Sequence, residues 1–374
     1  MDTYRIVTVS AFGIESVTKK ELKALGVVDP KAEEGSISFS GSSLDVARLN
    51  MFLRTADRVY IEVGRFTAAT FDALFDGISE IPWENHLDAD GAFVVTGKSK
   101  KSALFAVSSC QSIIKKAIIN RLSKHTNFKV FPETGAVFNI EFSINADVVT
   151  VLLNTSGKGL HKRGYRDLVG EAPMRETLAG ALLMLSDFNP ENAFIDPFCG
   201  SGTIVIEAAR MALDIASGID REFDFQKWSK FDQSVYDIAR QEALDNEKRD
   251  APLRVSGFDI DPEAIKLATR HAVRAGVKDK IHLQVRDVAE LKSRFAQGTI
   301  VTNPPYGERL MDIKTVNQLY KTLGEVYRAL DNWSIFVITS APEFERYFGL
   351  RSDKNRKLFN AGKECRFYSY FRRP

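Results

Sequence analysis

The sequence is poor in cysteine and lacks long apolar runs. Its three cysteines, Cys110, Cys199 and Cys365, are far apart and form neither a C-x-x-C zinc pair nor a disulfide framework. It has no run of about 18 apolar residues, the length that a membrane-spanning helix needs. Residues 1–20 lack the apolar core of a secretory signal. We therefore expect a cytoplasmic protein with no metal centre and no membrane association.

An excess of charge of one sign is also missing, since the net charge of the 374 residues is only +2. The charge is unevenly distributed, however. Residues 98–166 contain twelve Lys and Arg against three Asp and Glu, a net charge of +9, so the rest of the chain carries −7. A concentrated basic region on a nearly neutral protein is typical of a protein that binds a polyanion. The alternative is a solvated, lysine-rich surface.

The length favours two or three domains, because one hydrophobic core rarely serves so many residues. Residues 1–50 alternate strand and helix patterns and predict a small α+β unit. Residues 51–156 predict a second α+β unit. Residues 157–170 are rich in glycine and basic side chains, which indicates a linker, and residues 171–374 form the last domain.

The last domain has the pattern of an α/β fold. From residue 192 onward, short apolar segments alternate with helical stretches, which predicts a doubly wound parallel sheet with helices on both faces. Residues 357–360 and 365–371 read as the two strands of a hairpin around residues 361–364. The sequence therefore predicts a Rossmann-like sheet that ends in an antiparallel hairpin.

A glycine-containing loop follows the first strand of this sheet, at Asp196–Thr203. Two glycines in that segment would let the main chain pass close to a ligand, and Ser201 or Thr203 would cap the following helix. The dinucleotide pattern G-x-G-x-x-G fails, because its third glycine position holds Val205. The loop alone is a weak signal, and it favours a nucleoside-type ligand other than NAD.

Two aspartates end the next two strands. Asp259 lies 57 residues after Gly202, whereas a nicotinamide-binding unit places its acidic residue about 20 residues on. We expect the Asp259 carboxylate to accept the hydroxyls of a ribose, and Asp261 to cap a helix. Asp287 is expected to meet an adenine amino group, although a helix-capping role is open for it too.

The segment Asn303–Gly307, with the sequence Asn-Pro-Pro-Tyr-Gly, follows the fourth strand. An exocyclic amino group is a poor nucleophile because its lone pair is delocalised. The Asn303 side-chain oxygen and the Pro304 carbonyl would accept its two N–H bonds, and the prolines would hold these acceptors rigid. Tyr306 would stack on the flat acceptor group. A Pro-Pro turn with an asparagine cap is the structural alternative.

Together these strand-end segments resemble the motifs of class I amino-methyltransferases. The rest of the chain resembles RNA methyltransferases that contain a THUMP domain, and the form of Asn303–Leu310 is close to that of the 23S ribosomal RNA guanine-N2 methyltransferases. The segments that carry the resemblance outside the strand ends are Ala11–Glu15, Glu21–Gly26, Leu160–Arg166, Ala172–Ala179 and Asp214–Pro252.

The resemblance implies a ferredoxin-like leader at residues 1–50, a THUMP domain at 51–156, a linker at 157–170 and a catalytic domain at 171–374. It implies S-adenosylmethionine as cofactor and large-subunit ribosomal RNA, at guanine N2, as substrate. The implied catalytic residues are Asn303, Pro304 and Tyr306. The implied cofactor-binding residues are Asp196, Phe198, Gly200, Gly202, Thr203, Asp259, Ile260, Asp287, Val288 and Asn303. The implied RNA-binding residues are Lys98, Lys100, Lys101, Lys162, Arg163 and Arg166.

Other functions remain open at this point. The Asn-Pro-Pro-Tyr segment does not separate guanine N2 from adenine N6 or glutamine N5, so a methyltransferase for DNA or RNA adenine or for a protein amide is an alternative. A non-catalytic RNA-binding assembly factor is another. Some family members carry a second methyltransferase domain after this one, and because the chain ends at Pro374 we expect that second activity to be absent.

Overall fold

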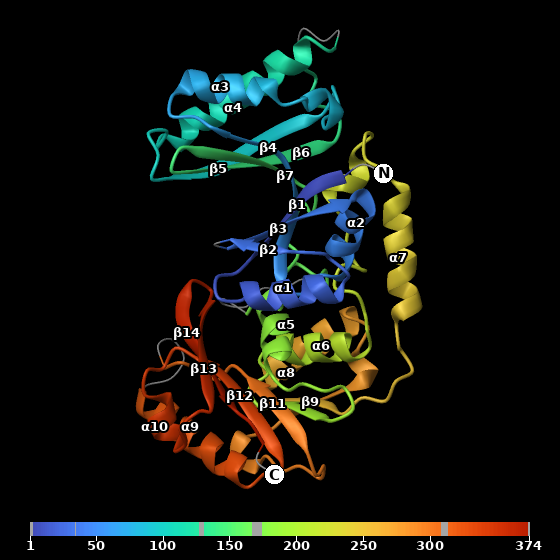
Figure 1. The fold of residues 1–374 in the computed structure, drawn as a ribbon. Coiled ribbons are helices and arrows are strands. Elements are labelled where there is room, and N and C mark those ends of the chain that lie inside the picture. Colours follow the sequence, from blue (N-terminus) through green and yellow to red (C-terminus); the bar gives the residue numbers. More distant parts are fainter. Residues whose placement is uncertain (1–2, 34, 127–130, 167–173, 308–312, 373–374) are drawn as a thin grey trace.

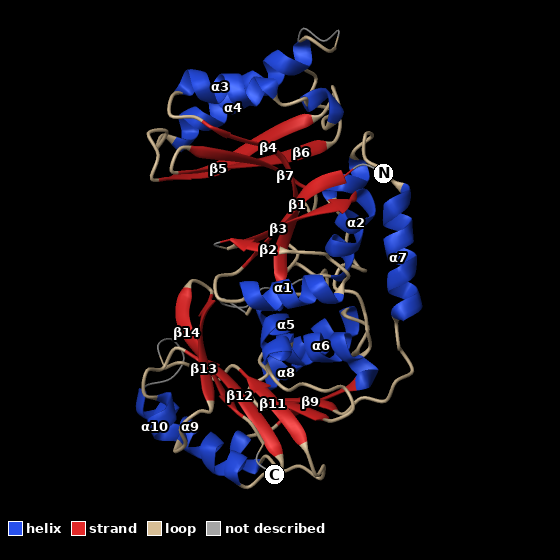
Figure 2. Cartoon of the chain, viewed as in Figure 1, coloured by secondary structure: helices blue, strands red, loops and turns tan. Residues whose placement is uncertain are grey.

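The computed structural model describes residues 3–33, 35–126, 131–166, 174–307 and 313–372. The described residues form two mixed sheets of seven strands each, one in each half of the chain (Figures 1 and 2). Part of the predicted linker (167–170), the segment 171–173 and residues 308–310 of the resemblance lie outside the described residues.

The N-terminal sheet has the strand order β2-β3-β1-β4-β7-β6-β5. Its strands are β1 (Thr3–Ser10), β2 (Lys31–Glu33), β3 (Ser36–Ser42), β4 (Ala56–Thr67), β5 (Ala92–Lys100), β6 (Val137–Asn145) and β7 (Val148–Asn154). Its helices are α1 (Glu15–Ala24), α2 (Ser43–Phe52), α3 (Phe71–Glu80), α4 (Val107–Ser123) and the short 3-10 helix η1 (Trp83–Asn85). We call residues 3–154 the N-terminal module.

Strand β4 joins the two units that the sequence predicts as separate. Its first part, Ala56–Glu62, pairs with β1, and its second part, from Tyr60 to Thr67, pairs with β7. Twelve residues of strand are long enough to serve both neighbours in turn. The two units therefore share one continuous sheet, as the upper half of Figure 1 shows.

The C-terminal sheet has the order β10-β9-β8-β11-β12-β14-β13. Its strands are β8 (Ala193–Asp196), β9 (Val255–Asp259), β10 (Ile281–Val285), β11 (Gly298–Thr302), β12 (Trp333–Thr339), β13 (Lys354–Asn360) and β14 (Lys363–Tyr370). Its helices are α5 (Glu176–Leu185), α6 (Thr203–Ala212), α7 (Ser234–Asn246), α8 (Pro262–Arg274), α9 (Ile313–Arg328) and α10 (Phe344–Phe348). Short 3-10 helices are η2 (Asp224–Lys227), η3 (Lys278–Lys280) and η4 (Val288–Glu290).

The strand directions in this sheet confirm the predicted fold class. Strands β8 to β12 run parallel, whereas β14 pairs antiparallel with both β12 and β13. Every residue of β11 and β12 is buried, because helices cover both faces of a parallel sheet. This burial explains why these strands read as unbroken apolar runs in the sequence.

The segment between α6 and β9 packs on the N-terminal module. Its aromatic side chains join the core of that module, and Trp228 stacks on Phe138 with ring centroids 5.3 Å apart. Helix α7 lies alongside α2 (Figure 1), where Arg48 and Glu242 form an ion pair at 2.7 Å. The catalytic domain thus holds the N-terminal module through a long insertion of its own.

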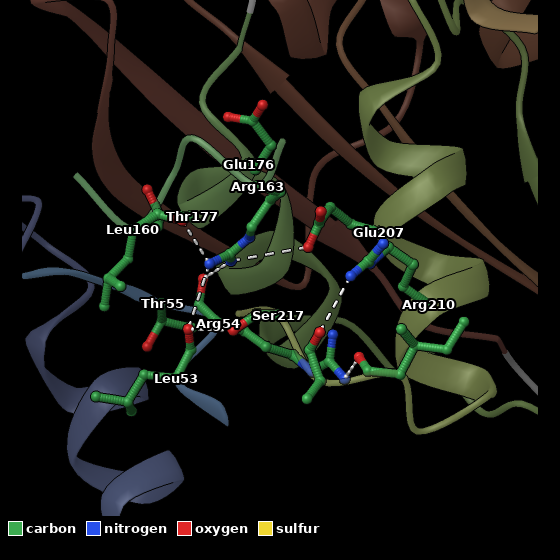
Figure 3. Close-up of polar contacts among 12 residues, drawn as sticks. Leu53, Arg54, Thr55, Leu160, Arg163, Glu176, Thr177, Glu207, Arg210 and Ser217 are labelled. Carbon is green, nitrogen blue, oxygen red and sulfur yellow. Dashed lines mark hydrogen bonds and ion pairs between the residues drawn. The ribbon is translucent and has the colours of Figure 1, made fainter. Parts of the chain in front are cut away.

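The described part of the predicted linker, residues 157–166, is packed around Arg163. The guanidinium donates to the carbonyls of Leu53 (3.3 Å), Arg54 (2.6 Å) and Leu160 (2.7 Å) and lies 3.8 Å from the Glu207 carboxylate. Figure 3 shows these contacts between the two halves of the chain. The Arg163 side chain is 1% exposed, so the prediction that it contacts RNA phosphate is wrong. Its charge is used inside the protein.

Arg166 is also committed to internal contacts. It pairs with Glu176 at 3.3 Å and donates to the Met174 carbonyl and to the Thr203 hydroxyl. Its side chain is 12% exposed and lines a cleft, so its contact with RNA phosphate stays a prediction. The other predicted RNA contacts, Lys98, Lys100, Lys101 and Lys162, are all exposed and remain predictions.

Three features bear on the classes of site that the sequence excludes. Cys110, Cys199 and Cys365 are free and buried. Among the residues that the structure describes, no His, Cys, Asp and Glu side chains gather in a group of three or more that could hold a metal ion. No helix in the described part of the chain has the length and apolar character needed to cross a membrane.

Candidate functional site

The carboxyl ends of four neighbouring strands bring the predicted site residues to one edge of the sheet. Asp196 ends β8, Asp259 ends β9, and Asp287 and Asn303 follow β10 and β11. Strand β8 lies between β9 and β11. The sheet therefore grows on one side of β8 through β9 and β10, and on its other side through β11 and β12. At such a switch in strand order, open α/β sheets bind their ligands in a crevice at the carboxyl edge, and we call this place the crevice.

The loop after β8 turns through two glycines in the left-handed region. Gly200 has φ +50° and Gly202 has φ +83°. A Cβ on Gly202 would lie 3.0 Å from the Ala268 Cβ, so only glycine fits this close approach of α6 to α8. The expected cap by Ser201 or Thr203 is not seen, because Gly202 itself is the N-cap of α6 and no side chain bonds to it.

Asp259 ties this loop to the second strand. One carboxylate oxygen accepts from the Gly200 amide at 2.9 Å, and the other accepts from the Asp261 amide at 3.0 Å. Each carboxylate oxygen has a second lone pair, so a pair of ribose hydroxyls can still donate to Asp259. The Asp261 side chain caps α8, as predicted, by accepting from the Glu263 amide.

The resemblance assigns Asp259 to the ribose of S-adenosylmethionine. On that assignment, replacing Asp259 with Ala should weaken cofactor binding by roughly 10- to 100-fold, because the two expected charge-assisted hydrogen bonds would be lost together with the anchor of Gly200. Isothermal titration calorimetry measures this affinity. Asp261→Asn is the matched control, since asparagine caps a helix as well as aspartate does. Equal affinities for the two variants would remove Asp259 from the ligand site.

Asp196 is the most deeply buried carboxyl of the site. It accepts from the Thr302 hydroxyl at 2.6 Å and from the Phe198 amide at 3.1 Å. Burial and, to a smaller extent, the nearby Asp259 charge raise the pKa of Asp196 to about 7, although the hydrogen bonds from Thr302 and Phe198 lower it. Thr302, which no sequence signal had marked, thus links β8 to β11 directly beneath the crevice.

The raised pKa of Asp196 predicts a specific pH dependence of stability. Between about pH 4 and pH 7 the folded state keeps a proton that the unfolded state releases, so the contribution of Asp196 to the free energy of unfolding falls as the pH rises. Asp196→Asn cannot ionise. In urea titrations, wild type should therefore lose stability relative to Asp196→Asn across this window and show no further change above it. A difference that stays constant from pH 4 to pH 8 would contradict the assignment.

Apolar side chains line the crevice beside the carboxylates. Ile260, directly after β9, is 67% exposed and Val285, at the end of β10, is 44% exposed. Phe198 is half-buried, and Asp287 is exposed while accepting from the Ala289 amide at 2.9 Å, so it does cap η4. The side chain of Val288 is buried in the core, so any contact of Val288 with a ligand would involve its main chain. This combination fits an adenosine group, which has one flat apolar and one hydroxylated part.

Asn303 and Tyr306 are in direct contact. The Tyr306 hydroxyl donates to the Asn303 side-chain oxygen at 2.5 Å, and the Asn360 amide donates to that hydroxyl at 3.2 Å. The Cys365 sulfur is 3.7 Å from the same hydroxyl, and the Lys363 amine lies 5.5 Å from the centre of the Tyr306 ring. The hairpin β13–β14 therefore holds Tyr306 from behind. Sequence reasoning missed these three residues, because nothing local links a terminal hairpin to Tyr306.

Pro304 and Pro305 complete this segment. Pro304 is buried, and the Pro305 carbonyl accepts from the Tyr320 hydroxyl at 2.8 Å. Strand β11 therefore fixes the main chain before Asn303, and the two prolines with Tyr320 fix it after Asn303. A rigid pair of oxygen acceptors at the end of β11 can orient an amino group that approaches from the crevice.

Three family descriptions match the chain in order. Residues 5–60 match "RlmL ferredoxin-like domain", residues 68–154 match "THUMP domain", and residues 163–369 match "RMKL-like, methyltransferase domain". The last match covers more than half of the 374 residues.

Curated relatives match along nearly the whole chain. YpsC of Bacillus subtilis strain 168, provisionally named an RNA methyltransferase, is 40% identical and covers 99% of this chain and 97% of its own length. The ribosomal RNA large subunit methyltransferase K/L of Psychromonas ingrahamii is 34% identical over 96% of this chain. The chain spans about half the length of the K/L relatives that it matches, 49% in this case.

Solved structures share the complete fold. A protein of Listeria monocytogenes strain 4b F2365, described as a predicted N6-adenine-specific DNA methylase, has a TM-score of 0.95 and 45% identity and covers 100% of this chain and 97% of its own. SMU.472, described provisionally as a methyltransferase and solved in complex with SAH, has a TM-score of 0.95 and 39% identity over 100% and 99% of the two chains. SAH is the product left when S-adenosylmethionine has given up its methyl group.

Proposed function

Because the chain belongs to the RMKL-like methyltransferase family, with a THUMP domain and S-adenosylmethionine as cofactor, we propose that it methylates the N2 amino group of a guanine in large-subunit ribosomal RNA. The observation that carries the proposal is the Asn303 side-chain oxygen at the end of β11. It is a fixed hydrogen-bond acceptor, bordered by two prolines and an aromatic ring.

This acceptor suits an exocyclic amine. As its N–H bonds donate to the Asn303 side-chain oxygen and the Pro304 carbonyl, the lone pair on nitrogen is withdrawn from the ring and becomes available for attack. When bound, S-adenosylmethionine would supply an electrophilic sulfonium methyl group, whose carbon–sulfur bond would break as the carbon–nitrogen bond forms, with SAH as the leaving group. The methylated nitrogen would then release one of its protons to water. The Tyr306 ring stacks on the base and keeps it oriented. The Asn303 oxygen has two lone pairs, so it can accept from the substrate while the Tyr306 hydroxyl keeps its present bond.

The other site residues bind and position the cofactor in this proposal. Asp259 accepts from the ribose hydroxyls, Asp287 accepts from the adenine amino group, and Ile260 and Phe198 cover the apolar faces. Gly200, Gly202 and Thr203 form the loop on which the rest of the cofactor lies. Asp196 supports the loop from below through the Phe198 amide.

The choice of ribosomal RNA rests on two observations. The K/L relatives are named as methyltransferases of large-subunit ribosomal RNA, although the chain spans only about half of their length. The THUMP-matching residues 68–154 carry the exposed lysines Lys98, Lys100 and Lys101, which suit an RNA backbone. The proposed place of action is the cytoplasm, where ribosomes are assembled in bacteria.

The test is methyl transfer from radiolabelled S-adenosylmethionine to deproteinised large-subunit ribosomal RNA from a strain that lacks this gene. Nucleoside analysis should give labelled N2-methylguanosine. Label on another nucleoside would keep RNA and overturn guanine N2. Label on DNA adenine or on a protein amide, with none on RNA or assembled large subunits, would overturn RNA as substrate. Binding of RNA with no label on any acceptor would support the non-catalytic assembly factor.

A further inference from the structure

A basic cleft lies outside the crevice at the strand ends. It has a volume of about 760 Å³ and forms where residues 158–166, the start of α5 and residues 220–227 meet. Its charged lining has an excess of three cations. The basic residues are Lys158, Lys162, Arg163, Arg166, Arg175, Arg221 and Lys227, and the acidic residues are Glu176, Asp220, Glu222 and Asp224. We call this the linker cleft.

Most of these cations already have an acidic partner. Arg175 is 3.3 Å from Asp57, Lys227 is 3.4 Å from Glu222, and Arg163 and Arg166 pair as described above. Lys158 and Lys162 differ, because both are exposed and neither forms an ion pair with a described residue. Among the described residues of the cleft, they are the two exposed cations without an acidic partner, so their charge is available to an incoming anion.

Arg221 fixes the loop that carries these two lysines. Its guanidinium donates to four main-chain carbonyls, those of Ser156 (3.1 Å), Gly159 (2.9 Å), Lys158 and Lys162. Burial and the neighbouring Arg163 charge lower the pKa of Arg221 to about 10. Carbonyl groups are neutral, so these four hydrogen bonds do not cancel the positive charge of Arg221. The loop is thus pinned on one side and presents Lys158 and Lys162 on the other.

The position of the linker cleft relates it to both halves of the protein. The loop follows directly after β7 of the N-terminal module. At its other end, Arg166 lines the cleft and also contacts Thr203, the first residue of α6 after the glycine loop. A chain of anions that crosses the cleft would therefore leave the THUMP-matching module and arrive beside the cofactor loop.

We propose that the linker cleft binds the sugar–phosphate backbone of the RNA substrate, with Lys158 and Lys162 as the phosphate contacts and Arg221 as the residue that positions them. The inference rests on the proposed function, and it names where the RNA crosses from the N-terminal module to the catalytic domain. A cleft of this volume takes more than one phosphate group, and lysine binds phosphate as a point charge without needing a fixed orientation.

The test reverses both charges in Lys158→Glu/Lys162→Glu and measures binding of fluorescently labelled large-subunit ribosomal RNA at several salt concentrations. Affinity should fall by roughly 10- to 100-fold. The negative slope of log affinity against log salt should become less steep by about 1.4, since each lost phosphate contact contributes about 0.7 for single strands. Affinity for S-adenosylmethionine should not change. The matched control is Lys292→Glu/Lys314→Glu, which makes the same change in net charge at exposed catalytic-domain positions outside the cleft.

The outcomes separate the cleft from the proposed function. If wild type methylates RNA and the cleft variant binds RNA as tightly as the control variant does, the linker cleft is not an RNA site, whereas the proposed methyltransferase function stands. If wild type binds no RNA, the proposed function fails first. Polyglutamate that competes with RNA at equal charge would point to an acidic protein and overturn the RNA assignment. If the reversed variant is unstable, Lys158→Gln/Lys162→Gln should still lower the salt slope, and an unaltered slope would overturn the proposal.

Discussion

Replacing Asn303 with Ala is expected to lower turnover by about 10²-fold or more, while affinity for S-adenosylmethionine stays close to that of wild type. The lost group is an acceptor whose hydrogen bond strengthens as the attacking nitrogen becomes positive, and losses of this size follow the removal of one transition-state hydrogen bond. Single-turnover methyl transfer to RNA, with calorimetry for the cofactor, measures the two quantities separately.

Tyr306→Phe is the control for this result. Because the Tyr306 hydroxyl donates to the Asn303 oxygen, the alanine variant also releases the tyrosine, and a changed ring position could lower turnover by itself. Tyr306→Phe loses the same hydrogen bond but keeps the ring and the Asn303 acceptor. Its turnover should remain within a few-fold of wild type. A loss as large as that of Asn303→Ala would move the assignment from the amide to the hydroxyl, and full activity of Asn303→Ala would refute both roles.

Replacing Arg163 with Met is expected to reduce the free energy of unfolding by about 3–5 kcal/mol, as the removal of one partner of a buried ion pair usually does. The change leaves the Glu207 carboxylate, 1% exposed, without the Arg163 cation and takes the donor from the Arg54 and Leu160 carbonyls. The Leu53 carbonyl keeps the Ser217 hydroxyl at 2.8 Å. Of the hydrogen bonds to Glu207 from described residues, the one from the Tyr165 hydroxyl at 3.0 Å remains. Urea unfolding, followed by fluorescence and by circular dichroism to detect intermediates, measures the loss.

The neighbouring residue gives the control. Lys162→Met removes the same charge from an exposed position, and its effect on stability should be within about 0.5 kcal/mol. Adding Glu207→Gln to Arg163→Met should restore part of the lost stability, since an amide is less costly to bury than an unpaired carboxylate. If Arg163→Met were as stable as Lys162→Met, the network of Figure 3 would not contribute to the stability of the contact between the N-terminal module and the catalytic domain.

The order of strand ends explains what could be predicted from the sequence. Asp196, Asp259, Asp287 and Asn303 each follow a short apolar run, and parallel strands bring such positions to one edge whatever the details of packing. Local rules also predicted the helix cap at Asp261, because an aspartate before a proline is a local signal. Residues whose place depends only on their own strand and its direction are therefore predictable.

What could not be predicted depends on distant partners. Arg163 stands in a short basic stretch rich in glycine, which looks like a solvated loop, and only the carbonyls of Leu53 and Arg54, more than a hundred residues away, give it a buried place. Strand β4 was missed for another reason. Three consecutive residues in its middle are buried, whereas half-buried and exposed residues alternate only near its end. The strand therefore lacks the regular period of two that predicts a half-buried strand.

The long strand β4 has a consequence for how this protein can change in evolution. Tyr60, Ile61 and Glu62 pair with β1 on one side and with β7 on the other, so neither N-terminal unit has a complete edge without the other. A gene rearrangement that cut between them would expose unpaired strand edges in both pieces, and such edges tend to aggregate. We therefore expect residues 3–154 to be inherited as one unit. Gene rearrangements should transfer the two N-terminal units together or not at all.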